Sequence, residues 1–403
     1  MSQLIAEGNK FYREGSYQLA LDCYVQFANK YPSLASTVDF NVNKTRMIIE
    51  KNNENLSGKC IKFEKKNKLN VLLVGRTETY TKGGIYKSCK LIKKHLEQIG
   101  HSVVEHDVHH PFNDRLEKFD LCWIYTGDPN RPDFESVDEK VEILKNNSIP
   151  TVINLSYNLV KDRSDYIVKK ILEYNRGDQT PVLAAFFTES ASLDETFSSI
   201  FDYTCVLPKT LVYENVIVNS PFKNRKGICI GDASKVSNPS IVGGDAQIWV
   251  DALKKKSPDI EIYVYKQYSG KNLIKGVTYA PYMPEKFGNW LSERKLFVCL
   301  NKFCTFEMVP CEAQHFGTPV IYRHMPQSLS EYLSITGFSV RTPNELAEIV
   351  SWLYNDEEAW NSLSMSSQYN AKSKHIDFLS YVIEGYIRLA KFRANSIMSS
   401  KII

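Results

Sequence analysis

A chain of 403 residues is too long for one ordinary hydrophobic core, so we expect two or three domains. The hydrophobic content of 43% and the charged content of 24% are typical of a globular protein, and the formal net charge of +4 gives no reason to expect a nucleic-acid partner. No apolar segment approaches the roughly 20 residues that span a bilayer, and residues 1–15 lack the apolar core of a signal peptide, so we predict a cytoplasmic protein without a transmembrane segment and leave peripheral membrane attachment open.

Nine cysteines raise the question of disulfides or metal binding. Their number is odd and they are spread through a long chain, which favours reduced, buried thiols over a disulfide framework. Two groups are close enough in sequence to be weighed as metal ligands, namely Cys299, Cys304, Cys311 and His315, and His106, His109 and His110. The first spacing fits no compact zinc finger, and the second group lies where a strand should end in a loop. We therefore predict no metal site.

Residues 1–60 carry the pattern of a helical hairpin. Their small and aromatic positions resemble one tetratricopeptide repeat with a glycine in its turn, and these positions are Gly8, Phe11, Gly15, Tyr17, Ala20, Tyr24 and Pro32. Residues 34–51 form a third helical stretch, but one repeat cannot bury a core alone. We therefore expect the hairpin to pack on the next domain, on another copy of the chain or on a partner protein; a buttress and a docking module are equally open. Residues 52–67 are the predicted linker.

Residues 68–220 are predicted to form a Rossmann-like domain. It opens with the buried strand LNVLLVG at 69–75, a helix at 85–100 and the strand HSVVEHDV. Gly83 and Gly84 stand just before this helix. A backbone without Cβ atoms can approach a ligand there and present N–H groups to it.

Three further predicted strands, at 119–127, 151–158 and 181–187, each run into polar residues. Because parallel strands end at the same edge of a sheet, these polar side chains should gather there. Asp128 is a candidate general base or a contact to an acceptor hydroxyl, since a carboxylate can take the proton that a nucleophilic hydroxyl loses. An aspartate before Pro129 is equally a common turn residue.

A polar segment at 214–225 is the expected connection to a second Rossmann-like domain at 221–375. Strands and helices alternate in it, as a doubly wound sheet requires. Groups that could neutralise a leaving diphosphate are Gly231, Lys235, Lys266 and Lys271. Near its end, residues 342–354 predict an amphipathic helix with Glu345 placed for a capping box.

The most informative stretch is LFVCLNKFCTFEMVPCEAQHFGTPVIY at 296–322, which reads as strand, loop, helix, turn and strand. Pro310 suits the first helical turn and Gly317 the C-terminal cap, and two strands joined through a helix predict a parallel sheet with a ligand at this loop. The free N–H groups of the helix start form an anion site, where Glu312 could also accept hydrogen bonds from sugar hydroxyls. A glutamate that merely satisfies the helix dipole is the alternative.

The segment TFEMVPCEAQHFGTPVI resembles the signature E-G-F-G-L-x-x-x-E-A-x-x-x-G-x-P-V of GT-B glycosyltransferases of the retaining, family-four type. The matching positions are Glu312, Ala313, Gly317, Pro319 and Val320. By this resemblance, Glu312 falls on the family's second glutamate, which binds the ribose. The first glutamate falls on Cys304, a departure, because a thiol accepts hydrogen bonds more weakly than a carboxylate. Glu307, in the same loop, is the candidate to supply the missing charge.

The resemblance implies an α/β protein with two Rossmann-like domains facing a cleft, preceded by the small all-α hairpin. It also implies that the C-terminal helix at 376–395 crosses back to the first domain. The co-substrate would be a nucleotide-diphosphate sugar of the UDP or GDP type, with no other cofactor. The implied contacts to this donor, beyond those named above, are Gly83, Gly84, Tyr282, Thr305, Phe306, Met308 and Val309.

The leading hypothesis is a retaining, metal-independent glycosyltransferase that acts on a glycan, a lipid-linked acceptor or a protein, with Asp128 and Glu307 as candidate catalytic residues. A catalytically degenerate scaffold is one alternative, because Cys304 stands where a catalytic carboxylate is expected. A sugar-nucleotide epimerase of the same fold is another. Nucleotide binding separates the scaffold from the enzymes, and release of an isomer separates the epimerase from the transferase.

Overall fold

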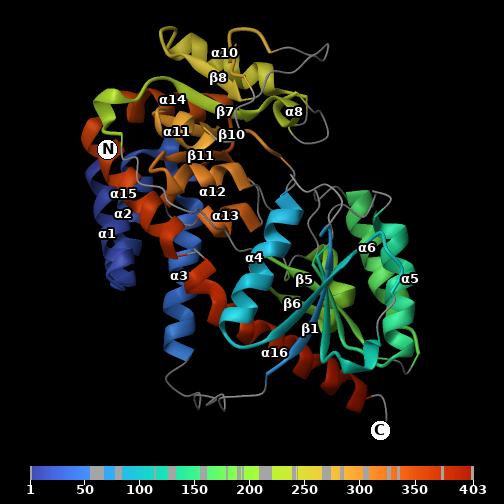
Figure 1. Ribbon diagram of the computed structural model, residues 1–403. Coiled ribbons are helices and arrows are strands. Elements are labelled where there is room, and N and C mark those ends of the chain that lie inside the picture. Colours follow the sequence, from blue (N-terminus) through green and yellow to red (C-terminus); the bar gives the residue numbers. More distant parts are fainter. Residues whose placement is uncertain are drawn as a thin grey trace. The chain divides into compact units, whose positions relative to one another are not determined.

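The computed structural model describes residues 2–54, 68–77, 84–112, 115–125, 133–154, 161–177, 180–187, 192, 195–207, 220–237, 242, 244–265, 274–281, 286–302, 308–324, 328–333, 336–373 and 376–400. These residues fall into two compact units, which we name by their strands (Figure 1). The β1–β6 unit lies within Glu64–Tyr213 and Ser373–Ile403, and the β7–β12 unit lies within Met1–Phe63, Glu214–Phe303 and Glu307–Lys372. Among the described helices, none is both long and apolar enough to cross a membrane.

The β1–β6 unit is built on a parallel sheet of six strands in the order β2-β1-β3-β4-β5-β6. Its elements are β1 (Asn70–Gly75), α4 (Gly84–Gln98), β2 (Ser102–Asp107), η3 (Leu116–Lys118), β3 (Leu121–Tyr125), α5 (Asp133–Asn146), β4 (Thr151–Asn154), α6 (Lys161–Tyr174), β5 (Val182–Phe186), η4 (Glu195–Tyr203), β6 (Thr204–Val206) and α16 (Ile376–Ser400). Every residue of β3, β4 and β5 is buried. This continuous apolar pattern is typical of parallel strands with helices on both faces.

Gly75, the last residue of β1, shows how closely α4 packs on this sheet. A Cβ atom at this position would lie 2.6 Å from the Sγ atom of Cys89 on α4 and 3.0 Å from the carbonyl oxygen of Tyr125 on β3. Both distances are shorter than ordinary van der Waals contact, so the approach of helix to strand depends on a glycine here.

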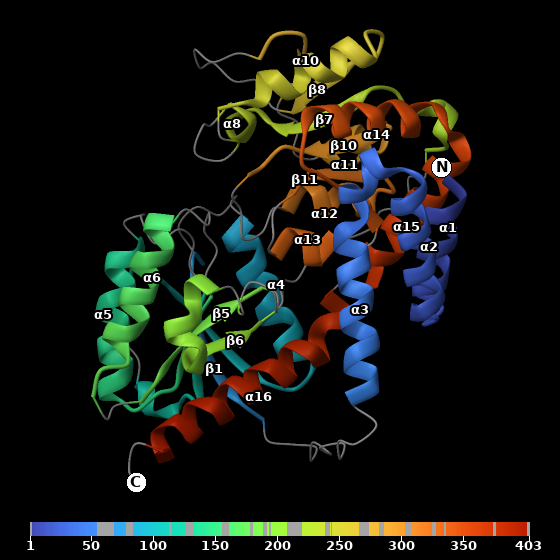
Figure 2. The ribbon, with the colours of Figure 1, turned by 180° about the vertical axis from the view of Figure 1, so that it is seen from behind.

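The last helix of the chain belongs to the β1–β6 unit. α16 packs against α4, β5 and β6, and the two opposite views agree that it runs along this sheet (Figure 1, Figure 2). Arg393 on α16 donates a hydrogen bond to the carbonyl oxygen of Thr204, at the start of β6. The chain therefore returns to its first sheet after completing the second.

The β7–β12 unit has a second parallel sheet of six strands, in the order β12-β11-β10-β7-β8-β9. Its elements are α1 (Ser2–Arg13), α2 (Tyr17–Lys30), η1 (Pro32–Val38), α3 (Asp39–Glu54), η5 (Phe222–Asn224), β7 (Ile228–Asp232), α8 (Ala233–Val236), α10 (Ala246–Lys256), β8 (Ile262–Tyr265), β9 (Thr278–Tyr279), α11 (Phe287–Ser292), β10 (Leu296–Cys299), α12 (Met308–His315), β11 (Val320–Arg323), α13 (Ser328–Leu333), β12 (Gly337–Val340), α14 (Pro343–Asn355) and α15 (Glu357–Ser373). Strands β8 and β9 lie on one side of β7, and strands β10, β11 and β12 lie on its other side. The order of strands therefore reverses between β7 and β10.

The N-terminal helices share a hydrophobic core with this second sheet. Phe27 on α2 and Val38 on η1 belong to the same buried cluster as Val340 on β12, and η1 packs on β12 and α14. The turn between α1 and α2 contains Gly15 with φ of +77°, as the sequence predicted. The hairpin thus belongs to the unit that holds the later sheet of the chain.

Candidate functional site

The carboxyl edge of the β7–β12 sheet has a hollow where the strand order reverses. Open α/β sheets bind ligands at such a position, because the loops after the two strands diverge there. The hollow lies between the ends of β7 and β10 and the first turn of α12, and its walls include Gly231, Asp232, Cys299, Asn301 and Val309. Its volume is about 10 Å³, the space of roughly one water molecule.

Gly231 leaves the backbone of β7 open to this hollow. Its φ of +110° lies in a region that only glycine adopts readily. A Cβ atom here would also lie 3.3 Å from the Cγ2 atom of Val236. The backbone angle strains any residue with a side chain and the valine makes the fit tight, so glycine leaves the peptide groups at the end of β7 open to close approach by a ligand.

Helix α12 is closed at its far end by the glycine that the sequence predicted. Gly317 has a φ of +66°. The N–H of Thr318 donates to the carbonyl of Ala313 at 2.8 Å, and the N–H of Gly317 donates to the carbonyl of Gln314 at 3.0 Å. These two bonds are a Schellman motif, which confirms Gly317 as the C-terminal cap and fixes the direction of the helix.

Polar side chains from α15 and the hydroxyl of Thr336, the residue before β12, hold the buried face and the end of α12. Gln314 donates to the hydroxyl of Thr336 at 2.7 Å and accepts from Asn370 at 2.7 Å. Ser364 donates to the carbonyl of Gly317 at 2.6 Å. Such a network allows few alternative positions, because each polar atom that lost its partner inside the protein would be costly. No pattern in the sequence marks these residues.

Glu312 lies on the same face of α12 as a residue of the hollow. It follows Val309 by three positions, which places the two side chains next to each other on a helix. Val309 lines the hollow, and Glu312 and Met308 are partly buried. The structure therefore brings Gly231, Val309 and Glu312 to one edge of one sheet, while their contact with a ligand stays a prediction.

Most other predicted site residues lie outside the described residues, and these are Gly83, Asp128, Lys266, Lys271, Tyr282, Cys304, Thr305, Phe306 and Glu307. Lys235 belongs to α8, but its side chain is not among the parts of the chain that the structure describes. Gly84 is the first residue of α4. Within the described ranges, no three His, Cys, Asp or Glu side chains are grouped closely enough to hold a metal ion.

Polar residues also gather at the carboxyl edge of the β1–β6 sheet. Asp107, at the end of β2, is 2% exposed and accepts hydrogen bonds from the N–H of Thr77 at 3.0 Å and of His109 at 3.1 Å. It therefore fixes the segments that follow β1 and β2. The sequence predicted a polar edge here from the strand ends, but it did not single out Asp107.

Tyr125 and Asn154 end the neighbouring strands β3 and β4 and lie opposite each other in the sheet. Burial raises the pKa of the Tyr125 hydroxyl well above its ordinary value. Asn154 accepts a hydrogen bond from the indole N–H of Trp123, and its Nδ2 atom has no acceptor among the described residues. Both side chains carry polar atoms to this edge, and the sequence did not distinguish them from other strand residues.

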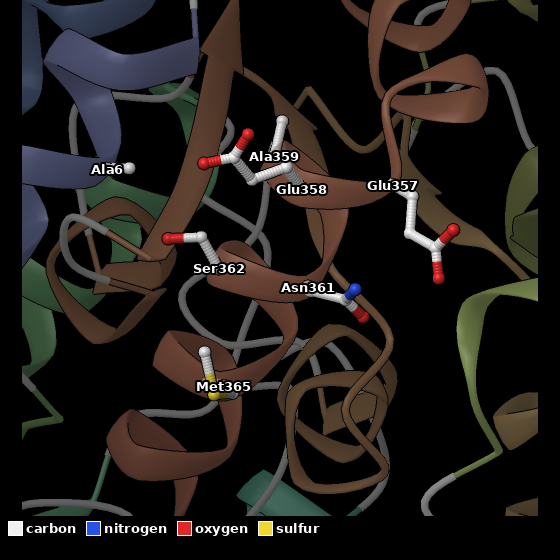
Figure 3. A pocket seen from close by; sticks show the side chains of 7 residues that line it. All are labelled: Ala6, Glu357, Glu358, Ala359, Asn361, Ser362 and Met365. Atoms are coloured by element: carbon white, nitrogen blue, oxygen red, sulfur yellow. The ribbon is translucent and has the colours of Figure 1, made fainter.

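A second cavity lies between α1 and α15 (Figure 3). It has a volume of about 570 Å³ and is lined by Ala6, Glu357, Glu358, Ala359, Asn361, Ser362 and Met365. Glu358 and Ser362 extend toward the side of Ala6, whereas Glu357 and Asn361 extend the other way (Figure 3). None of these residues belongs to β7, β10 or α12, so the cavity is separate from the hollow.

Comparison with known proteins identifies the fold. No model of a protein family matches the chain, and no curated protein matches it either. Among solved structures, Anabaena HepE in complex with UDP matches with a TM-score of 0.57 at 13% identity, over 79% of this chain and 100% of that one. HepE in complex with UDP-glucose matches with a TM-score of 0.54 at 12% identity, over 79% and 99%. The chain has the GT-B fold.

A variant of S. aureus TarM in complex with Fondaparinux, alpha-GlcNAc-glycerol and UDP matches with a TM-score of 0.51 at 13% identity, over 67% of this chain and 55% of that one.

The topology and the HepE matches confirm the predicted fold class, two Rossmann-like domains after an N-terminal helical hairpin. The likeness of that hairpin to a tetratricopeptide repeat stays a prediction. Identities this low establish the fold alone, so the activity has to be argued from the site.

Proposed function

We propose that this protein is a glycosyltransferase that moves a sugar from a nucleotide-diphosphate sugar to a hydroxyl group of an acceptor. The observation that carries the proposal is the position of α12. The helix begins at the hollow, next to Gly231 near the carboxyl end of β7. The fold is GT-B, and the solved structures that match it include complexes with UDP and UDP-glucose. A UDP-sugar is therefore the first donor to test, with a GDP-sugar as the second.

In this proposal the β7–β12 unit binds the donor. Glu312 accepts hydrogen bonds from the ribose hydroxyls, and the free N–H groups at the start of α12 hold the diphosphate. Lys235, Lys266 and Lys271 add positive charge where negative charge develops on the leaving group, which lowers the barrier without a metal ion. Tyr282 stacks on the base. The remaining donor contacts are Gly231, Thr305, Phe306, Met308 and Val309.

The acceptor binds to the β1–β6 unit in the same proposal. Asp128 contacts the acceptor hydroxyl or takes its proton, and Glu307 supplies the carboxylate that Cys304 cannot. Gly83 and Gly84 are further proposed contacts to the donor diphosphate. Retention of configuration follows if the departing phosphate itself takes the acceptor proton. A glycan, a lipid-linked acceptor and a protein are the acceptor classes to compare.

Titration calorimetry with UDP, GDP and UDP-glucose tests the donor assignment. We expect Glu312→Ala to weaken binding of the preferred nucleotide about 5- to 150-fold, because 1–3 kcal/mol is the usual cost of leaving buried polar partners unpaired. Glu348→Ala is the matched control, since this exposed glutamate on α14 pairs with Lys256 and is not part of the hollow. If the folded Glu312→Ala variant bound the nucleotide as tightly as the parent protein, Glu312 would not be part of the donor site.

A sequence feature favours a second candidate, a nucleotide-binding protein without transferase activity, because Cys304 replaces a carboxylate of the family signature. Mass spectrometry of donor and candidate acceptors separates the two. A hexose-sized mass gain on an acceptor supports the transferase, and nucleotide binding without any product supports the scaffold. Conversion of the nucleotide sugar into an isomer would instead identify an epimerase.

A further inference from the structure

Arg225 is a buried cation whose described partners include no carboxylate. Its side chain is 1% exposed. Its Nε atom donates to the carbonyl of Ser220 at 2.8 Å, Nη1 donates to the carbonyl of Arg294 at 3.2 Å and to the hydroxyl of Thr318 at 2.7 Å, and Nη2 donates to the carbonyl of Phe316 at 3.0 Å. Burial lowers the pKa of the guanidinium to about 10, so it remains charged at neutral pH.

Dipoles and an aromatic ring compensate this charge instead of an anion. The carbonyl of Phe316 follows directly on α12 and points its negative end at the guanidinium, as the C-terminal end of a helix dipole does. The guanidinium carbon lies 4.7 Å from the ring centre of Trp360 on α15. A buried charge without an ion partner is costly to keep. A hydrophobic side chain in its place would avoid this cost but would leave three carbonyls and one hydroxyl without this donor, so the arginine is kept by the segments that it joins.

Three of the four acceptors of Arg225 lie at the ends of segments that face away from the hollow. Arg294 precedes β10, Phe316 directly follows α12, and Thr318 leads into β11. The other ends of β10 and α12 line the hollow. α12 has eight residues and is therefore about 12 Å long. One planar guanidinium thus joins strand and helix at the end opposite the hollow.

We propose that Arg225 is a positioning residue for the donor site. From the end opposite the hollow it fixes where α12 lies along β10, and it thereby holds the start of α12 at the hollow. This inference rests on the proposed function, because the donor is what α12 would bind. Arg225 itself touches no ligand. The rigid fork of an arginine can serve several acceptors at once, whereas the ammonium group of a lysine is a compact point charge on a flexible stem. Arg225→Lys keeps the charge and loses the fork.

The matched control is Arg294→Lys in the same unit. Arg294 is also buried, at 7% exposure, and its guanidinium carbon lies 4.4 Å from the ring centre of Tyr263 and 5.0 Å from that of Trp290. Its side chain donates to the carbonyl of Trp290 and to Glu293. None of these side-chain bonds goes to α12, and the substitution keeps the backbone carbonyl of residue 294 that accepts from Arg225, so the control removes a comparable buried arginine and leaves the bonds of Arg225 in place.

The first measurement is hydrogen exchange of the free protein, followed by mass spectrometry. Arg225→Lys should speed exchange of the peptide over residues 308–318 about tenfold, because the local opening of α12 becomes easier, while Arg294→Lys leaves this peptide within about twofold of the parent protein. The second measurement is UDP affinity by calorimetry. Arg225→Lys should weaken it about 5- to 20-fold, a loss of about 1–2 kcal/mol, and Arg294→Lys should change it less than about twofold.

Equal exchange of the 308–318 peptide in the two lysine variants would overturn the proposal, and so would unchanged UDP affinity in a folded Arg225→Lys variant. If the parent protein binds no nucleotide, the proposed function fails, and the exchange comparison still shows whether Arg225 holds α12. If Arg225→Lys does not fold, Thr318→Val takes its place. It removes one acceptor of Arg225, together with the bond that the hydroxyl donates to the carbonyl of Leu291, with little change of volume. It should affect the same peptide and the same affinity in the same direction.

Discussion

Lys391 on α16 donates a hydrogen bond of 2.9 Å to Asp120, which precedes it by 271 positions in the chain. Asp120 also accepts from the N–H of Asn70, the first residue of β1, at 2.9 Å. One carboxylate thus fastens the last helix to the amino end of the first sheet, at the edge opposite the polar strand ends. The C-terminal helix is in this way part of the unit that the proposal assigns to the acceptor.

We expect a double-mutant cycle of Asp120→Asn and Lys391→Met to give a coupling energy of about 0.2–1 kcal/mol in urea unfolding, since both side chains are partly exposed. Burial raises the pKa of Asp120, but hydrogen bonds from Asn70 and Lys391 outweigh it, and the pKa lies below its ordinary value. The coupling should therefore be present above the ordinary carboxyl pKa and disappear as the pH falls through the lowered value. A coupling that persisted unchanged in strong acid would contradict this account.

His101 should make the β1–β6 unit less stable in mild acid. Its Nδ1 atom accepts from the N–H of Leu69 at 3.2 Å, so the neutral ring suits the folded protein. Burial lowers its pKa, and Glu384, 3.5 Å from Nε2, offsets part of this effect. The unfolded chain then takes up the proton first, and stability is lost as the pH falls below about 6.5.

Urea unfolding at pH 7 and at pH 5 checks this prediction. His101→Gln should reduce the loss of unfolding free energy between the two pH values. His109→Gln should leave that loss as it is in the parent protein, because His109 is exposed. An equal effect of both variants would show that His101 is not the group responsible.

Gly75→Ala should destabilise the protein by about 1–3 kcal/mol, the usual cost of overpacking a core, because its Cβ atom would meet Cys89 and Tyr125. Gly385→Ala in α16 is the control. Nothing lies within 4 Å of a Cβ atom at that position, so the change should stabilise the helix by about 0.5–1 kcal/mol. Urea unfolding measures both, and the prediction is the difference in sign between two identical substitutions.

The capping box of α14 should contribute about 1 kcal/mol. The Thr342 hydroxyl accepts from the N–H of Glu345 at 3.2 Å, and the Glu345 carboxylate accepts from the N–H of Thr342 at 3.4 Å. Thr342→Ala should lower the free energy of unfolding by that amount, and Thr342→Ser should restore most of it because the hydroxyl is kept. Equal losses in both variants would assign the effect to the methyl group of the threonine.

Part of the candidate site could be predicted from the sequence. Gly231 was chosen as the glycine after a strand, and Val309 and Glu312 as part of a helix start, and the structure places them at one sheet edge. Asp232 and Asn301 line the same hollow without having been predicted. A polar residue after an apolar strand is too common to single out one position, and only the strand order shows which strand ends are neighbours.

The amino-acid sequence by itself determined β1 to β5 of the first sheet, β10 and β11 of the second, the cap at Gly317 and the capping box at Thr342, but it did not reveal β6 or β12. Each of these depends on residues a few positions apart, where the spacing of apolar side chains and the chemistry of a helix end act directly. Only the tertiary structure decided that the N-terminal hairpin packs on the second sheet, that α16 is fastened to Asp120, and that Arg225 meets carbonyl groups from two distant segments, at Arg294 and at Phe316. Those contacts join residues far apart in the chain, and they exist only once packing has brought the segments together.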